Sequence, residues 1–294
     1  MKFALSLLFF GAFAFAQSPS NYHNDRDESH LCGPFQIEAI EKDSLYASWF
    51  QKNYTAIEAP SNIPKWVEKL DDTTVEIYMG TWCGDSKKWV PRFLKLWDAY
   101  GLDRSKLQFT ALYDTDEKYK QGPNGEEKGK KIHRVPTFIF KRDGTEYARI
   151  VESPRNDLKT DLQQIALGVS SEPNYRGASY LIDVLEKMTP EEIYKDVNRY
   201  FSKCYDLVCK SRELNTLVFV FLRAGEIEKA FLTFNFNRHY FKNEAYVHAS
   251  MAEAFQINND KEKAINNYKK ALELDPENKK IKEKIAVLEK EIQK

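Results

Sequence analysis

The chain has 294 residues, enough for one large domain or two ordinary ones. Its 44 basic and 44 acidic residues balance, and no basic segment is interleaved with aromatic residues, which argues against a nucleic-acid partner. Aromatic residues make up 14% of the chain, which favours packed cores over disorder, and four cysteines are too few for a disulfide-dense scaffold.

The N-terminal segment predicts export. Lys2 precedes an apolar run over residues 3–15, and the small residues Ala14 and Ala16 mark its end. This layout is typical of a signal peptide, so we expect residues 1–16 to be removed near Ala16 and the mature protein to be periplasmic or secreted. A buried N-terminal helix or a short anchor is the alternative, although the run is shorter than the about 20 residues that span a bilayer. No other apolar run is long enough to cross a membrane, so no stable membrane insertion is expected.

The next part of the chain changes from a helical to a strand pattern. Residues 17–34 have the composition of a flexible leader, and helices are expected around Ser44–Tyr54 and Pro64–Leu70. Apolar runs predict buried strands at Thr74–Met79 and Leu107–Tyr113. Between these strands, four apolar residues recur at the spacing i, i+3, i+4, i+7 and define one face of a helix: Val90, Phe93, Leu94 and Trp97.

A polar loop over Lys118–Lys131 separates this unit from a hairpin and a closing helix. The hairpin strands, Thr137–Lys141 and Thr145–Val151, flank a short glycine-containing turn, and the helix covers Leu158–Ala166. This order of elements predicts an α/β fold over residues 35–168, with a central mixed sheet and helices on both faces.

Residues 178–294, beyond a linker at 169–177, predict an all-helical domain. One helix start is marked clearly. Thr189 can cap the helix, Pro190 suits the first helical position, and Glu192 can reach back to the cap.

The tail also contains an internal repeat. The segment Ala224–Phe231 can be laid over Asn258–Ile265 with an offset of 34 residues, which is the spacing of tetratricopeptide helix pairs. The second copy, Lys263–Pro276, closely resembles the second helix and exit turn of the tetratricopeptide family. About three repeats are usually needed to close a core, so helices between Tyr180 and Cys209 are expected to complete the stack. Unrelated helical hairpins are the alternative; a repeat stack implies a protein or peptide partner.

One cysteine stands where a helix would begin. Cys83 follows the strand that ends near Met79 and precedes the next predicted helix. A sulfur at such a junction faces backbone N–H groups and the positive end of the helix dipole, which stabilise the nucleophilic thiolate. Lys87 and Lys88 would add to this effect, and Asp85 would oppose it.

Over roughly residues 58–168 the chain resembles the thioredoxin superfamily. Trp82, Cys83 and Gly84 match the family's Trp-Cys-Gly-x-Cys turn, and Pro91 stands at the family's kinking proline, eight residues after the first cysteine. The segment 135–137 is similar to the family's cis-proline segment, which faces the sulfur. The resemblance implies a thioredoxin-like mixed sheet with flanking helices, Cys83 as the nucleophile, and a substrate site formed by its neighbours: Trp82, Gly84, Asp85, Val135 and Pro136.

Two departures from the family pattern bear on function. Ser86 replaces the second cysteine, and Ile77 occupies the place where many thioredoxins bury an aspartate. In dithiol exchange the second thiol breaks the mixed disulfide, and a serine cannot do this. Ser86 is therefore expected to donate a hydrogen bond to the Cys83 sulfur without resolving the intermediate, and release requires another thiol.

These features favour an exported thiol–disulfide exchange protein that uses one cysteine, either as an isomerase or to capture a partner. Its partners would be protein thiols or disulfides, and no cofactor is required. The alternative is a non-enzymatic protein-binding adaptor in which Cys83 is a relict. A third interpretation, peroxide reduction by Cys83, lacks the Pro-x-x-x-Thr-x-x-Cys setting of peroxiredoxins.

The other cysteines and the histidines leave several interpretations open. On one continuous helix, Cys204 and Cys209 would be about 8–9 Å apart at Cα, beyond the about 7 Å that a disulfide allows. A structural bridge therefore requires a helix break between them; buried free thiols and a redox role are the alternatives. Cys32 could tether the leader, stay free or resolve the mixed disulfide. His133, three residues before Pro136, is expected to pack or to lie at the surface, with a place at the border of the site as the alternative, and the histidine spacing predicts no metal site.

Overall fold

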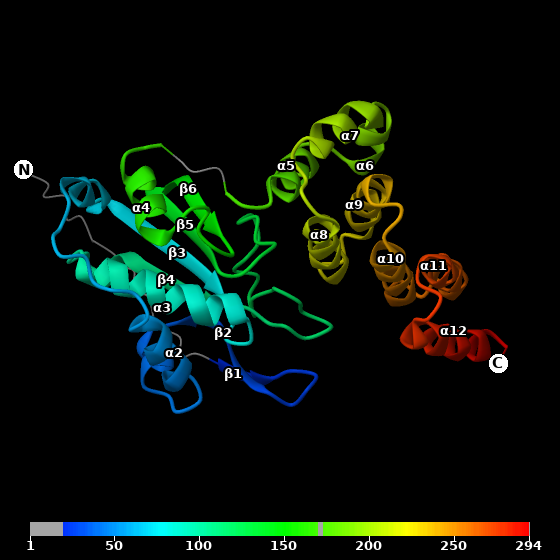
Figure 1. Ribbon diagram of the computed structural model, residues 1–294, viewed down its shortest axis with the longest axis horizontal. Coiled ribbons are helices and arrows are strands. Elements are labelled where there is room, and N and C mark those ends of the chain that lie inside the picture. The colour runs from blue at the N-terminus through cyan, green and yellow to red at the C-terminus, as the bar shows by residue number, and fades with distance from the viewer. Residues whose placement is uncertain (1–19, 170–172, 294) are drawn as a thin grey trace, which may run out of the picture.

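The computed structural model describes residues 20–169 and 173–293, which form a six-stranded sheet with helices packed on it, followed by a succession of helices (Figure 1). This arrangement confirms the predicted fold class, an α/β domain followed by an all-helical domain. The predicted signal peptide at residues 1–16 lies outside the described residues. Within the described ranges, no helix is long and apolar enough to span a bilayer.

The sheet is mixed, with the strand order β1-β2-β4-β3-β5-β6. The central strands β3 and β4 run parallel, and the other neighbouring pairs are antiparallel. β-Branched residues, threonine included, and aromatic residues are frequent in β3 and β5, which suits strands inside a sheet. The strands are β1 (Ser20–His23), β2 (Ser29–Phe35), β3 (Thr73–Met79), β4 (Leu107–Ala111), β5 (Thr137–Arg142) and β6 (Thr145–Val151).

The expectation of a flexible leader over residues 17–34 is wrong from Ser20 onward. Strands β1 and β2 pair as an antiparallel hairpin, and β2 extends the sheet by pairing with β4. Leu31 and Phe35 anchor β2, because both side chains lie in the main core. The polar residues between the two strands, 24–28, dominate the composition of this segment, so the composition gives no sign of the strand β2 that follows them.

The helical segments of the α/β domain all contribute side chains to one core cluster. The predicted helix between β3 and β4 is the longest of these segments, and it begins at the residue after Cys83. A 3-10 turn, η2 (Arg104–Lys106), precedes β4. The segments that share the core are α1 (Glu38–Glu41), α2 (Ala47–Tyr54), the 3-10 helix η1 (Lys65–Leu70), α3 (Gly84–Ala99) and α4 (Leu158–Ala166).

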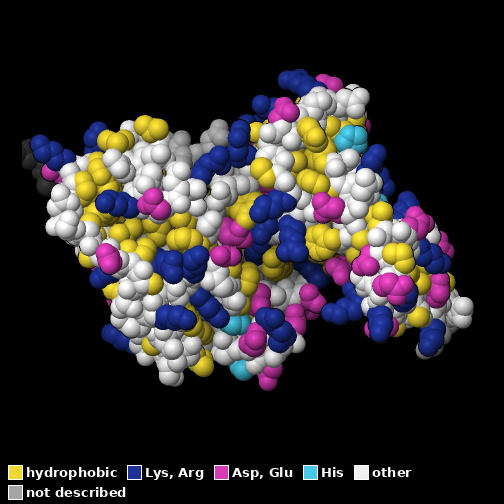
Figure 2. Space-filling model, in the orientation of Figure 1, with side chains coloured by type: hydrophobic (Ala, Val, Ile, Leu, Met, Phe, Trp, Pro, Cys, Tyr) yellow, Lys and Arg dark blue, Asp and Glu magenta, His cyan; other side chains and the backbone are white. Residues whose placement is uncertain are grey.

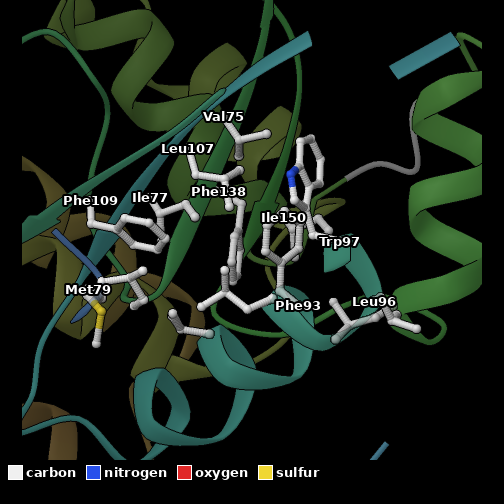
Figure 3. Close-up of a cluster of buried hydrophobic side chains, with 14 of the residues drawn as sticks. Val75, Ile77, Met79, Phe93, Leu96, Trp97, Leu107, Phe109, Phe138 and Ile150 are labelled. Atoms are coloured by element: carbon white, nitrogen blue, oxygen red, sulfur yellow. The ribbon is translucent and has the colours of Figure 1, made fainter. Parts of the chain in front are cut away.

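One face of the sheet carries this core. In strands, successive side chains point to opposite faces. Alternate residues of β3 to β6 therefore meet the apolar side of α3 (Figure 3). The ring of Phe93 in α3 lies 4.8 Å from the ring of Phe138 in β5, measured between centroids. The strand residues labelled in the figure are Val75, Ile77, Met79, Leu107, Phe109, Phe138 and Ile150.

The opposite face of the sheet is covered by the loop between β4 and β5, residues 112–136. The described residues of this loop form turns and contain no helix, so the expected helix on this face is not observed. A second, smaller core cluster joins the loop to the sheet: Tyr78, Leu112, Ile132, Val135 and Ile139, with Trp82 and Cys83 packed against it. The cysteine of interest therefore lies on the loop-covered side.

The tail contains helix pairs that repeat with the predicted period. Helix α8 (Ser211–Arg223) packs against α9 (Ile227–Tyr240), and α10 (Ala245–Ile257) packs against α11 (Lys261–Leu274). Each helix of the second pair begins and ends 34 residues after its counterpart. The sequence repeat thus corresponds to a repeat of structure.

The remaining tail helices extend this stack at both ends (Figure 1). Helix α5 begins two residues before the expected domain start at residue 178. Thr189 and Glu192 form the expected capping box at the start of α6, with the threonine hydroxyl accepting the Glu192 N–H at 3.2 Å. These helices are α5 (Arg176–Leu185), α6 (Pro190–Tyr194), α7 (Val197–Tyr205) and α12 (Lys279–Ile292).

Candidate thiol site

Cys83 is the residue that directly precedes helix α3. Its backbone is extended, with φ −85° and ψ 124°, and its carbonyl accepts the N–H of Lys87 at 3.0 Å. The first turn of the helix therefore starts immediately after the thiol. The residue is half-buried, and its place directly before α3 puts it at the positive end of the helix dipole.

The loop between β4 and β5 returns to this thiol. The Val135–Pro136 peptide bond is cis, and the Cys83 thiol donates a hydrogen bond to the Val135 carbonyl with an Sγ–O distance of 3.2 Å. Both loop residues are buried. Thr137 Oγ1 donates to the carbonyl of Arg134 at 2.7 Å and fixes the loop where β5 begins. The structure thus brings Cys83, Val135 and Pro136 together.

Trp82 forms one side of the site. Its indole Nε1 donates to the Leu112 carbonyl at 2.7 Å, and its ring centroid lies 6.2 Å from that of Tyr119. Gly80 makes this position possible, because a Cβ atom at Gly80 would come 2.6 Å from Trp82 Nε1. The sequence motif identifies Trp82, but nothing in it identifies Gly80 or Tyr119.

Ser86 stabilises the turn that carries Cys83. The side chain is fully buried, and its hydroxyl accepts the N–H of Gly80 at 3.2 Å. Among the described residues no hydrogen bond joins Ser86 to Cys83, so the expected bond to the sulfur is not observed. The reason is that the otherwise unpaired N–H of Gly80 lies within reach of the hydroxyl. Gly84 is exposed and Asp85 is half-buried on the first turn of α3.

Two buried titratable side chains lie on the loop-covered face. Lys120 is 4% exposed and His133 is 2% exposed, and Lys120 Nζ donates to the His133 carbonyl at 2.9 Å. Burial lowers the pKa of Lys120 to about 7 and the pKa of His133 to about 3. His133 is buried, which agrees with the packing role expected for it and not with a surface position. The sequence does not predict the burial of Lys120, because this lysine belongs to a polar, lysine-rich segment that is typical of a solvated loop.

The tail packs against this same loop. Gln121 Nε2 donates to the Arg223 carbonyl at 2.8 Å, and Arg134 Nη2 donates to the Arg212 carbonyl at 2.9 Å. Arg134 also pairs with Glu152 at 3.0 Å. On the face shown in Figure 2, Lys and Arg side chains gather along the junction of the two domains. The junction therefore borders the thiol site.

A groove of about 690 Å³ opens between the two domains, and Figure 2 shows a hollow there. Residues 114–116 and Tyr119 line one wall, and α8, α10 and α12 line the other. Because Tyr119 also neighbours Trp82, the groove adjoins the thiol site. Asn215 of the second wall is 4% exposed, and its Oδ1 has no partner among the described residues.

The four cysteines are free thiols, so the Cys204–Cys209 disulfide considered from the sequence is not formed. Helix α7 does end between these residues, as a bridge would require. The two sulfurs nevertheless lie against different carbonyls. Cys204 is fully buried with its Sγ 3.9 Å from the Gly177 oxygen, whereas Cys209 is exposed with its Sγ 4.0 Å from the Leu207 oxygen.

Cys32 lies in strand β2 and is 2% exposed. Its Sγ is 3.4 Å from the carbonyl oxygen of Ser20 in the neighbouring strand. Because the β1–β2 hairpin encloses the sulfur, Cys32 does not meet a substrate unless the hairpin opens. This position disfavours the resolving role considered from the sequence.

No group of three or more His, Cys, Asp or Glu side chains that could hold a metal ion occurs within residues 20–169 and 173–293. A scan against protein-family models finds no match for this chain, and a search of curated proteins finds none either. The function is therefore inferred from the geometry of the site.

Proposed function

We propose that this protein is an exported thiol–disulfide exchange protein that works with one cysteine, Cys83. The observation that carries the proposal is the position of the Cys83 sulfur, at the start of α3 and 3.2 Å from the Val135 carbonyl of a cis-proline loop. The element order β3-α3-β4 followed by β5-β6-α4 supports a thioredoxin-like domain. The helix pairs offset by 34 residues support a tetratricopeptide-like tail.

The proposed reaction is an exchange of disulfide bonds. The Cys83 thiolate attacks one sulfur of a substrate disulfide, a new Sγ–S bond forms, and the other substrate sulfur leaves as a thiolate. Ser86 offers no second thiol, and its hydroxyl is engaged with Gly80. The mixed disulfide then persists until an external thiol attacks the substrate sulfur and restores Cys83. This behaviour suits isomerisation or partner capture better than net reduction.

The proposed substrate is a polypeptide. Trp82, Val135 and Pro136 would flank the sulfur that Cys83 attacks. The groove that starts at Tyr119 gives a continuing segment of the chain a surface on both domains.

Mixed-disulfide formation tests the proposal. Cys209→Ser is used as the reference protein, because Cys209 is the exposed cysteine and would react non-specifically. Incubation with a disulfide-bonded unfolded protein, followed by acid quench and intact-mass measurement, should show a one-to-one adduct. The Cys83→Ala, Cys209→Ser variant should form none. The proposal fails if Cys83 reacts no faster than free cysteine at the same pH.

A protein-binding adaptor is the second candidate, and the groove with the unpartnered Asn215 oxygen supports it. An adaptor requires no thiol chemistry, so a partner should bind Cys83→Ala as tightly as the reference protein. An exchange protein should lose covalent capture in that variant while retaining weak non-covalent binding.

A further inference from the structure

Lys120 is a buried lysine that has no ion-pair partner among the described residues. Its Nζ donates to the His133 carbonyl at 2.9 Å and lies 4.5 Å from the centroid of the Tyr119 ring. Burying an ammonium group without a contacting carboxylate is unfavourable. The stability of the fold therefore gives no reason for a lysine at this position.

Lys120 and Cys83 are bound to the same short stretch of loop. The carbonyl of His133 accepts from Lys120, and the carbonyl of Val135, two residues later, accepts from the Cys83 thiol. A negative charge on the Cys83 sulfur would raise the pKa of Lys120, so the two groups are coupled electrostatically. One geometry of the loop thus positions both the amine and the thiol.

The Tyr119 ring faces the ammonium group of Lys120, but no carboxylate among the described residues contacts it. Desolvation lowers the pKa of Lys120 most, Arg134 lowers it further, and Glu152 raises it only through longer-range attraction, since its carboxylate contacts Arg134. Tyr119 and His133 are neutral near pH 7, because burial raises the pKa of Tyr119 to about 12 and lowers that of His133 to about 3. A thiolate at Cys83 is therefore the anion best placed to favour the charged form of Lys120.

We propose that Lys120 is the electrostatic partner of Cys83, holding the proton that the thiol gives up and stabilising the thiolate until it attacks. This inference rests on the proposed exchange reaction. When the thiolate forms its bond with a substrate sulfur, the negative charge passes to the leaving sulfur. Lys120 then releases its proton, which reaches the leaving thiolate through solvent. When an external thiol restores Cys83 as a thiolate, Lys120 takes up a proton again.

Alkylation kinetics of Cys83 test this role in the Cys209→Ser protein, where Cys32 and Cys204 are buried. Lys120→Met removes the charge with little change of length, and it should slow alkylation by iodoacetamide roughly tenfold at pH 6.5. Lys118→Met is the matched control, because Lys118 belongs to the same loop but is exposed. Its effect should stay within about twofold, since exposed charges are screened.

The pH dependence separates an electrostatic role from a structural one. The ratio of the alkylation rates of the reference protein and Lys120→Met should fall toward one at pH 9, because Lys120 loses its proton above about pH 7. A packing defect would give the same ratio at every pH. A constant ratio, or equal rates at pH 6.5, overturns the proposal.

A measurement on the intact side chain covers the case in which Lys120→Met does not fold. The ¹³Cε resonance of Lys120 should titrate near pH 7 and at a lower pH in Cys83→Ser, where no thiolate forms. Equal midpoints in the two proteins overturn the proposal. Both experiments measure the electrostatic coupling between Lys120 and Cys83 and not the exchange reaction. They therefore still test this inference if no mixed disulfide forms and the proposed exchange function is wrong.

Discussion

Replacing Lys120 by methionine should stabilise the folded protein at neutral pH. The same substitution should slow the alkylation of the Cys83 thiol. In the folded state the ammonium group is desolvated, and it keeps a hydrogen bond to the His133 carbonyl and a contact with the face of the Tyr119 ring. In the unfolded state the same group is fully hydrated. The substitution therefore removes an unfavourable burial at the position where we infer a functional charge.

The magnitude follows from the pKa of Lys120 in the two states. The pKa is about 7 in the folded protein and about 10.4 in an unfolded chain. At pH 7 this difference corresponds to about 4 kcal/mol of unfavourable free energy in the folded state. Methionine removes that contribution, but it leaves the His133 carbonyl without its donor, at a cost of about 1–3 kcal/mol. A net stabilisation of about 1–3 kcal/mol remains.

The sign of the pH dependence provides the assay. Because the folded pKa lies below the unfolded pKa, the unfolded chain binds more protons between pH 7 and about 10.4, so this lysine makes the stability of the wild type rise with pH there. Urea unfolding followed by tryptophan fluorescence at pH 7 and pH 9.5 should show a smaller rise for Lys120→Met than for Lys118→Met. The reasoning is refuted if Lys120→Met is less stable than the wild type at pH 7 or keeps the full rise.

Three further outcomes are expected. The pKa of His133 is about 3 in the folded protein and about 6.5 when unfolded, so its contribution to stability should fall by about 2 kcal/mol between pH 7 and pH 5; urea titrations of His133→Leu should lack this part of the loss. Ser86→Ala should lower the free energy of unfolding by about 1–3 kcal/mol, because the buried N–H of Gly80 loses its acceptor; an unchanged urea midpoint would contradict this. Gly80→Ala should displace the Trp82 indole, which stands where the added Cβ would go; altered tryptophan emission and slower alkylation of Cys83 should appear together.

Much of the α/β domain could be predicted from the periodicity of its side chains. Val90, Phe93, Leu94 and Trp97 lie at helical spacing and all face the core from α3. The hairpin β1–β2 could not be predicted in this way. Strand β1 has four residues, the turn is polar, and the place of the hairpin in the sheet depends on the pairing of β2 with β4, which is distant in the sequence.

The site was only partly predictable for a similar reason. The motif resemblance indicated that Cys83 faces the loop at Pro136, and the sulfur does lie beside it. The partner of Ser86 depends on the position of the Gly80 N–H, which no pattern of residue types reveals. The burial of Lys120 depends on this polar loop covering the second face of the sheet, where helices were expected, and the loop's composition gives no sign that it packs there.

The tail determines the position of that loop. The residue after Lys120 is Gln121, which is bound to the last residue of α8, and the residue after His133 is Arg134, which is bound near the start of α8. Each of the two residues joined by the Nζ–carbonyl hydrogen bond, Lys120 and His133, is thus followed in the chain by a residue that contacts the same tail helix. A polypeptide in the groove between the two domains, as proposed above, would meet the same helix at Asn215. A displacement of α8 is therefore expected to shift the loop that carries Lys120 and Val135, so substitutions that loosen the packing of α8 on this loop should change the reactivity of Cys83.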